Sequence, residues 1–296
     1  MEVQLLYFFK NIATPFLDII ANFSSYLAED AVLICLIIVI YYGYSKKKAY
    51  AIFTSLTTAL LTTCVFKAIV KTPRPFVSHP ELLSQRLETA TGYSFPSGHT
   101  TNSSAFYPTI GRLFKNNALL IIGIIIAVFT MISRLYLRVH YLSDVTVGLM
   151  IGLLFSLALS PIFESLYVKK SILIRYFALL LFLTATALTI GLEFFNLDPI
   201  AYKDLLKVTA LAFGGHFAVH TELNTTNFKE DSNIKYLIPN LLLCVLGVAL
   251  IMVAESFTSA YIGYFSYLLF MPLLSYWAIG LYPKVAIKLL LLRSQN

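Results

Sequence analysis

The chain has 296 residues, of which 58% are hydrophobic and only 12% are charged. Soluble domains typically carry about 25% charged residues, so this composition excludes an ordinary soluble enzyme and indicates a helical protein of the membrane bilayer. The net charge of +7 does not indicate nucleic-acid binding, because the Lys and Arg residues lie in short loops and at the C-terminus. Basic residues at such places set the orientation of membrane helices.

Apolar runs predict the helices. Residues 3–28 are apolar but interrupted by polar residues and a proline, which is typical of an amphipathic helix in the membrane interface. Nine further runs follow, near 31–44, 50–70, 99–112, 118–132, 141–163, 172–193, 203–220, 236–254 and 259–281. Because about 20 apolar residues cross a bilayer, we predict an all-α transmembrane bundle of about nine spans. The expected parts are an interfacial segment 1–28, five core spans in 29–165, and four additional spans in 166–296 whose role the sequence does not indicate.

Basic residues recur at one end of the predicted spans. They are Lys46, Lys47, Lys48, Arg112, Lys115, Lys169, Lys170, Arg175, Lys284, Lys288 and Arg293. The positive-inside rule makes this end and the C-terminus cytoplasmic, in what we expect to be a bacterial inner membrane. The loop 71–94, the start of the third span and the stretch 133–144 are then all predicted on the extracytoplasmic side.

Two cations lie at the end of the second predicted span. Lys67 and Arg74 are seven residues apart, so they share nearly one face if the helix continues between them. Pro73 and Pro75 indicate instead that the helix ends there. Arg binds phosphate through two N–H groups at once and Lys adds a point charge, so the pair predicts an anionic ligand. Interfacial charge is the alternative interpretation.

A short turn, Pro96-Ser97-Gly98-His99, precedes the third predicted span. Gly98 permits close approach to the backbone, and the N–H groups at a helix N-terminus bind anions. Ser97 can donate its hydroxyl to an anion or cap the helix, and His99 would stand beside the anion. A plain helix cap with an interfacial histidine is the alternative.

Four charged or titratable residues lie between the fourth and fifth predicted spans: Arg134, Arg138, His140 and Asp144. Such residues at membrane depth indicate a functional site by default. His140 and Asp144 are four residues apart and can meet on one helix face, where a carboxylate makes an imidazole a better nucleophile or base. Arg134 is expected at the end of the fourth span and Arg138 only at the interface. The alternative is that all four anchor the chain in the interface.

The three clusters together match the needs of phosphoryl transfer. Cations neutralise the oxygens of the transferred group, one histidine attacks in line, and another protonates the leaving oxygen. The sequence has no carboxylate cluster for Mg²⁺ and no zinc ligand set, so no metal or other cofactor is predicted. His216 and His220 are four residues apart but lack further ligands and lie at the predicted cytoplasmic end, so a structural role is favoured for them.

The clusters resemble, in order and in spacing, the signature motifs of the type 2 phosphatidic acid phosphatase superfamily, which includes glucose-6-phosphatase-like and vanadium-haloperoxidase-like members. The matching residues are Lys67-x6-Arg74-Pro75, Pro96-Ser97-Gly98-His99 and Ser133-Arg134-x5-His140-x3-Asp144. The resemblance implies that the first five spans form the family's helical core. It also implies that His140 is the nucleophile and forms a phosphohistidine, with Asp144 orienting it and His99 as the general acid. The implied phosphate-binding residues are Lys67, Arg74, Arg134, Ser97 and Gly98.

We therefore expect an integral membrane phosphatase that hydrolyses a lipid phosphate or diphosphate monoester at the extracytoplasmic face without a metal. Candidate substrates are phosphatidic acid, phosphatidylglycerophosphate, undecaprenyl diphosphate and lipid A phosphates. Three alternatives stay open: a sugar-phosphate phosphatase of the glucose-6-phosphatase kind, a lipid phosphotransferase, and a transporter or scaffold with a vestigial site. The sequence does not indicate which substrate is used, the organism or the oligomeric state.

Overall fold

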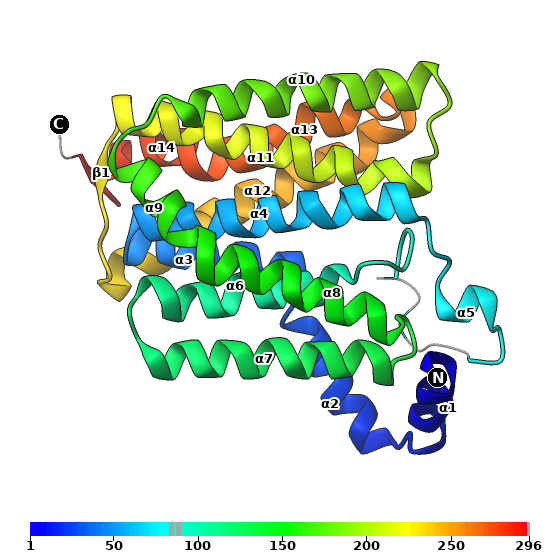
Figure 1. The fold of residues 1–296 in the computed structure, drawn as a ribbon. Coiled ribbons are helices and arrows are strands. Elements are labelled where there is room, and N and C mark those ends of the chain that lie inside the picture. The colour runs from blue at the N-terminus through cyan, green and yellow to red at the C-terminus, as the bar shows by residue number, and fades with distance from the viewer. Residues whose placement is uncertain (83–85, 87–89, 295–296) are drawn as a thin grey trace. The chain divides into compact units, whose positions relative to one another are not determined.

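A computed structural model describes residues 1–294 except 83–85 and 87–89 (Figure 1). Its helices are α1 (Glu2–Asn11), α2 (Pro15–Tyr26), α3 (Asp30–Gly43), α4 (Lys46–Val70), α5 (Pro75–Ser78), α6 (Gly98–Leu113), α7 (Asn117–Tyr136), α8 (Leu142–Leu153), α9 (Ser160–Val168), α10 (Leu173–Phe194), α11 (Pro199–Thr225), α12 (Ile234–Ile262), α13 (Phe265–Tyr276) and α14 (Tyr282–Lys288). π-helical turns at Leu154–Leu159 and Trp277–Leu281 connect α8 to α9 and α13 to α14. Two short antiparallel strands, β1 (Phe228–Lys229) and β2 (Arg293–Ser294), form a single ladder. The predicted all-α fold class is confirmed.

Six helical segments in the described part of the chain are long and apolar enough to cross a membrane, namely Lys46–Ser78, Asn117–Tyr136, Leu142–Val168, Leu173–Phe194, Ile234–Ile262 and Phe265–Lys288. Helices α2 and α3, bent by 49°, would together form a seventh. Every predicted span corresponds to a helix, but nine is only an approximate count because α6 and α11 fall outside this set. Helix α6 has 16 residues, fewer than a bilayer requires, and α11 carries charged residues along its length.

The chain divides into two compact units, which we call the N-terminal unit (residues 1–34 and 55–161) and the C-terminal unit (residues 35–54 and 162–296). Every residue of the three sequence motifs lies in the N-terminal unit. The C-terminal unit takes in the end of α3 and the start of α4 together with α10 to α14. We describe each unit by itself.

Helix α6 occupies the core of the N-terminal unit, where it packs against α7 and α8 (Figure 1). Its small polar residues 100–104 are all buried, in keeping with their predicted place inside a bundle. Glycines on α8 allow the close approach: a Cβ atom on Gly148 would lie 2.7 Å from the carbonyl oxygen of Ser97. One on Gly152 would lie 2.7 Å from the Ala105 backbone nitrogen. The first half of α6 therefore packs closely against the middle and end of α8.

The predicted interfacial segment forms two helices, α1 and α2, and one flank of α2 packs on α7. Ser133 Oγ donates to the Ala21 carbonyl oxygen at 2.6 Å, and the Tyr136 hydroxyl donates to Asp18 Oδ1 at 2.7 Å. Helix α2 begins where Thr14 caps it and Pro15 occupies its first position. Large apolar side chains are exposed elsewhere on α2, namely Phe16, Ile19 and Phe23.

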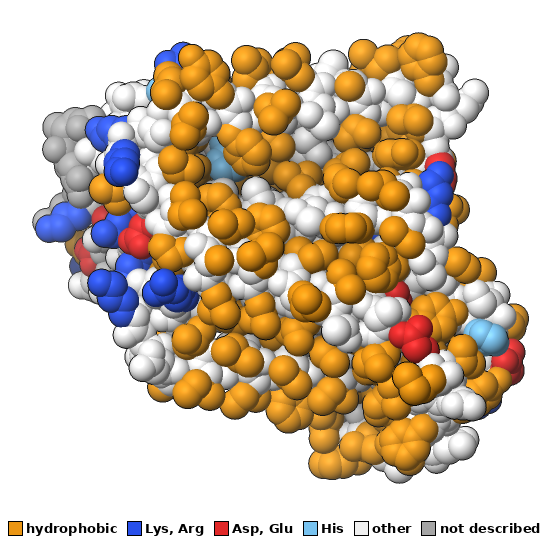
Figure 2. Space-filling view, viewed as in Figure 1, with side chains coloured by type: hydrophobic (Ala, Val, Ile, Leu, Met, Phe, Trp, Pro, Cys, Tyr) orange, Lys and Arg blue, Asp and Glu red, His pale blue; other side chains and the backbone are white. Residues whose placement is uncertain are grey.

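In the C-terminal unit, α11 packs against α10 and α13. Gly214 makes this contact possible, because a Cβ atom there would lie 2.5 Å from Pro272 Cα. Helix α10 exposes several large apolar side chains, namely Leu179, Leu180, Leu183, Ile190 and Phe194. Figure 2 shows hydrophobic side chains gathered along the edge of the view where Figure 1 places α10. Exposed apolar surface of this extent is typical of a helix that faces lipid.

Candidate active site

His140 lies in the short connection between α7 and α8, and its side chain is almost fully buried. Its ring nitrogens have different partners. Arg74 Nη1 lies 3.2 Å from Nε2, and Asp144 Oδ2 lies 3.3 Å from Nδ1. A guanidinium can only donate and an ionised carboxylate can only accept, so Nε2 accepts and Nδ1 carries the proton. The geometry therefore favours a neutral imidazole whose lone pair is on Nε2, the nitrogen available to attack.

Asp144 orients this imidazole and is itself held in place. Its Oδ2 accepts hydrogen bonds from the Tyr141 backbone N–H at 2.8 Å and from the Ser94 hydroxyl at 2.5 Å. Ser94 Oγ also lies 3.4 Å from His140 Nδ1. Asp144 is the third residue of α8, where the helix dipole stabilises a negative charge. All of these contacts fix the Nδ1 side of the ring and leave Nε2 to face the cations.

The pKa of His140 lies well below the ordinary histidine value, mainly because of burial and further because of the positive charges of Arg74, Arg134 and Lys67. Burial disfavours the imidazolium, and each nearby cation repels it. The neutral form therefore predominates at neutral pH and persists as the pH falls below the ordinary value. The three cations act on one imidazole although they come from α4, from the residue before α5 and from α7.

Backbone carbonyls orient the first two cations. Lys67 donates to the carbonyl oxygen of Tyr93. Arg74 donates three hydrogen bonds, at 2.5, 3.0 and 3.1 Å, to the carbonyl oxygens of Thr91, Gly92 and Val139. Both side chains are buried. Helix α4 ends at Val70, between the two cations, as the prolines predict. The loop before α6 thus holds Lys67 and Arg74 in the site.

Ser97 and Gly98 stand at the start of α6, as the N-cap and the first helical residue. Ser97 is fully buried; its backbone N–H donates to the Asp144 carbonyl oxygen at 3.0 Å, and its hydroxyl accepts from Thr100 at 3.1 Å. The side-chain cap that was one interpretation of Ser97 is not formed. A Cβ atom on Gly98 would meet no atom within 4 Å, so open space adjoins the first turn of α6.

Three of the predicted site residues carry buried polar atoms with no hydrogen-bond partner among the described residues: His99 Nε2, Nε and Nη2 of Arg134, and Oδ1 of Asp144. Arg134 is fully buried, and its third nitrogen, Nη1, donates to Ser25 Oγ at 2.5 Å. An unsatisfied buried polar group costs about 1–3 kcal/mol, and a charged one costs more. Such groups are rare unless a ligand completes them, so this arrangement suits a bound anion.

Two serines in the site carry no sequence signal. Ser94 belongs to no predicted motif, and Ser25 lies on α2, far from the motifs in the sequence. Their roles arise because the loop crosses the site and because α2 packs on α7, and no local sequence pattern predicts either contact.

Arg138, expected at the interface, is instead only 6% exposed and donates to the Tyr136 carbonyl oxygen at 3.2 Å.

Replacing Ser94 with alanine is expected to lower kcat about tenfold with little change in KM, because Asp144 loses a donor and the imidazole is less firmly oriented. Steady-state kinetics with a phosphate ester substrate would measure this. Ser103→Ala is the matched control: Ser103 is buried on α6, and among the described residues its hydroxyl donates to the Thr100 carbonyl oxygen alone. An unchanged kcat for Ser94→Ala would show that Ser94 does not position the pair.

The two other histidines considered as ligands are separately engaged. His216 Nδ1 lies 3.0 Å from the Tyr50 hydroxyl, and His220 Nδ1 lies 3.3 Å from Asn224 Nδ2. In the described part of the chain, no group of three or more His, Cys, Asp or Glu side chains is placed to share a metal ion.

Comparison with known families now adds to this geometry. Residues 48–167 match the model of the PAP2 superfamily, and the match includes all eight predicted site residues. The chain is therefore similar to the PAP2 superfamily over this segment. The chain is 41% identical over 73 residues to phosphatidylglycerophosphatase B of Bacillus subtilis, a match that covers 22% of this chain and only 36% of that protein. A second match, to the undecaprenyl-diphosphatase BcrC of the same organism, is 29% identical over 145 residues and covers 47% of this chain and 73% of the relative.

Two solved structures also resemble the chain. A transmembrane PAP2 type phosphatidylglycerolphosphate phosphatase from Bacillus subtilis is 25% identical, with a TM-score of 0.49, over 55% of this chain and 84% of that one. LpxE of Aquifex aeolicus is 23% identical, with a TM-score of 0.45, over 55% of this chain and 94% of that one. The apolar helices described above support an integral membrane protein, and its similarity to the PAP2 superfamily lies in residues 48–167.

Proposed function

We propose that this protein is a lipid phosphate phosphatase that works through a phosphohistidine on His140. One observation carries the proposal: buried polar atoms of Arg134 and His99, which have no partner among the described residues, belong to the same site as a neutral imidazole whose Nε2 lone pair faces the cations. A phosphoryl group has the several acceptor oxygens that such donors require. Both curated relatives are named for phosphatase activity on membrane lipids, which supports a lipid substrate.

The first chemical step is attack by Nε2 of His140 on phosphorus. The N–P bond forms as the bond to the leaving oxygen breaks, and a protonated His99 gives that oxygen its proton. Burial and the nearby cations, Arg134 first among them, hold the pKa of His99 well below its ordinary value, and the negative charge of a bound phosphate beside the ring opposes this and favours the protonated form. The Arg74 N–H that lies against Nε2 turns to a phosphate oxygen when substrate binds, while Asp144 stabilises the positive charge that develops on His140.

The second step returns the enzyme to its starting state. His99 removes a proton from water, the oxygen of that water attacks phosphorus, and the N–P bond breaks to release inorganic phosphate. The negative charge of the transferred group is stabilised in both steps by Lys67, Arg74, Arg134, Ser97 and the backbone at Gly98.

We place the site at the extracytoplasmic face, because the basic loops are expected on the opposite side. Residues 29–165 would carry this chemistry, with 1–28 lying at the membrane interface.

Phosphate release by the purified protein in detergent, with a chelator present, tests the proposal. Phosphatidic acid, phosphatidylglycerophosphate and undecaprenyl diphosphate are the lipid substrates to compare with glucose 6-phosphate. We expect release from a lipid substrate and inhibition by vanadate, which imitates the transferred phosphoryl group. Preference for glucose 6-phosphate would support the sugar-phosphate alternative, and transfer to an added lipid alcohol would support a phosphotransferase. No release from any substrate, together with no vanadate binding, would indicate a vestigial site.

The pH profile gives a second test. Because the folded protein holds the pKa of His140 below its ordinary value of 6.5, protonation inactivates the nucleophile only at lower pH. We therefore expect kcat/KM to be maintained as the pH falls through about 6.5, with its acid limb lying below that value. An acid limb with an apparent pKa at or above 6.5 would contradict the proposed role of the buried imidazole.

A further inference from the structure

A side chain of α2, Ser25, reaches Arg134 in the phosphate site. Ser25 is the next-to-last residue of α2, it is fully buried, and its Oγ lies 2.5 Å from Nη1 of Arg134. A guanidinium can only donate, so the serine oxygen accepts this hydrogen bond. Ser25 also lies outside residues 48–167, the segment that is similar to the PAP2 superfamily. The family motifs therefore do not account for the contact that holds Arg134.

The contact with Ser25 leaves one edge of the Arg134 guanidinium open. Nη1 is held by the serine, whereas Nε and Nη2 are buried and have no hydrogen-bond partner among the described residues. Nε and Nη2 form one edge of the planar group, and their N–H bonds point the same way. This edge is a fork that can bind two oxygens of a phosphate at once. Ser25 thus occupies the nitrogen that a phosphate bound in this way does not need.

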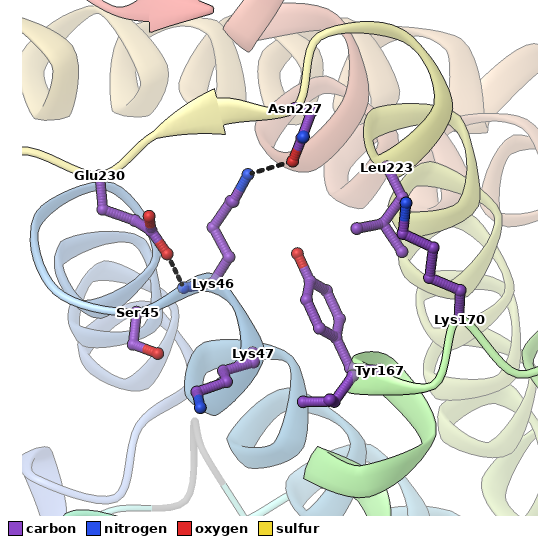
Figure 3. A pocket seen from close by; sticks show the side chains of 9 residues that line it. Ser45, Lys46, Lys47, Tyr167, Lys170, Leu223, Asn227 and Glu230 are labelled. Carbon is purple, nitrogen blue, oxygen red and sulfur yellow. Dashed lines mark hydrogen bonds between the residues drawn. The ribbon is translucent and has the colours of Figure 1, made fainter. Parts of the chain in front are cut away.

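The charge of Arg134 is not paired, in contrast to two lysines that line a small cavity in the C-terminal unit (Figure 3). There Lys46 lies 3.0 Å from Glu222 Oε1, and Lys47 lies 3.6 Å from Glu164 Oε1. For Arg134, no carboxylate in the described part of the chain lies within ion-pair distance. An anion at the open edge of the guanidinium would supply the missing negative charge.

Hydrogen bonds between α2 and α7 fix the spacing between the serine and the arginine. The Ser133 hydroxyl donates to the Ala21 carbonyl oxygen at 2.6 Å, and the Thr130 hydroxyl donates to the Ser24 carbonyl oxygen at 3.4 Å. The first donor lies directly before Arg134, and the second lies about one helical turn before it. The serine hydroxyl is therefore presented to the guanidinium by two helices that are bound to each other beside it.

We propose that Ser25 is a positioning residue for phosphoryl transfer, which holds Nη1 of Arg134 so that Nε and Nη2 face the phosphoryl group. This role rests on the proposed function of the His140 site, and it adds α2 to that site. The serine does not touch the substrate but acts through the arginine. A long side chain such as arginine has many rotamers, so loss of the serine frees the guanidinium to turn, and the fork is then less often aligned with the phosphate.

A double-mutant cycle on the full chain in detergent tests this role. The variants are Ser25→Ala, Arg134→Met and the two combined, and the measurements are kcat/KM for a lipid phosphate and the dissociation constant of vanadate. Ser25→Cys keeps the size of the side chain but offers only a weak acceptor, so it tests the hydrogen bond even if Ser25→Ala unfolds. Ser24→Ala is the matched control: Ser24 is buried on the same helix, and Thr130 binds its carbonyl oxygen, which alanine retains.

We expect Ser25→Ala and Ser25→Cys to lower kcat/KM and to weaken vanadate binding about tenfold, while Ser24→Ala stays near the parent protein. In the Arg134→Met background, loss of the serine should have no further effect, because the hydroxyl acts only through the guanidinium. A serine with a merely structural role would lower activity by the same factor in both backgrounds. The role is overturned if Ser25→Cys behaves as the parent protein, if the loss persists in Arg134→Met, or if Ser24→Ala has the same effect.

The same measurements separate this role from the proposed function. If the parent protein releases phosphate and His140→Ala does not, while the Ser25 variants behave as the parent protein, only the role of Ser25 is overturned. If the parent protein neither releases phosphate nor binds vanadate, the proposed function fails, and the phosphate contact of Arg134 fails with it.

Discussion

Replacing His140 with alanine is expected to lower kcat for a lipid phosphate by about 10³-fold or more, because the attacking nitrogen is lost. The affinity for inorganic phosphate should change far less, since Lys67, Arg74 and Arg134 remain in place. Steady-state kinetics and equilibrium binding of phosphate measure these two effects separately. A loss of affinity with kcat preserved would assign His140 to binding and not to catalysis.

His220→Ala is the matched control for this experiment. His220 is a partly exposed histidine on α11, in the C-terminal unit, and its ring contacts Asn224. Its replacement should leave kcat near the parent value. Comparable thermal unfolding of both variants would exclude a general loss of folding as the cause of inactivity in His140→Ala.

Replacing Arg134 with methionine is expected to lower kcat/KM by about 10²- to 10³-fold, the usual effect of removing a donor that stabilises charge in the transition state. The same change should maintain or raise the thermal unfolding temperature. Arg134 is fully buried and two of its nitrogens have no partner in the described part of the chain, so its charge is costly to the stability of the fold. Lower activity with equal or greater stability is the expected result of a residue placed for a ligand.

Lysine variants sharpen this test. Arg134→Lys keeps the charge but loses the guanidinium's paired N–H groups, so activity should be only partly restored. Arg138→Lys makes the same exchange four residues later, at a buried position that is assigned no contact with phosphate, and should keep activity near the parent value. If Arg134→Met unfolded the protein while Arg134→Lys remained fully active, the proposed phosphate contact through the guanidinium would be contradicted.

The sequence predicted the parts of this fold that depend on local pattern. The apolar runs located the helices, the small polar residues of α6 predicted its burial, and Pro73 and Pro75 predicted that α4 ends before Arg74. The count of nine spans was approximate because hydropathy alone does not separate a short buried helix such as α6 from a true crossing.

Features that depend on tertiary contact were not predicted. Ser25 reaches Arg134 only because α2 packs on α7, and Ser94 reaches Asp144 only because the loop before α6 crosses the site. Lys46 was interpreted solely as a charge that sets membrane orientation. In the structure it is buried and paired with Glu222, 176 residues away in the chain, and it forms one wall of a cavity. Long-range pairs of this kind leave no periodic pattern in a single sequence.

Trapping the covalent intermediate tests the central claim most directly. A brief reaction with a radiolabelled lipid phosphate would be stopped in alkali, which preserves a phosphohistidine, and the labelled peptide would be identified by mass spectrometry. We expect the phosphoryl group on His140 and no label in His140→Ala. We also expect label to accumulate in the variant in which His99 is replaced by alanine, when the substrate has a good leaving group. Label on another residue, or full turnover by His140→Ala, would contradict the assignment of His140 as the nucleophile.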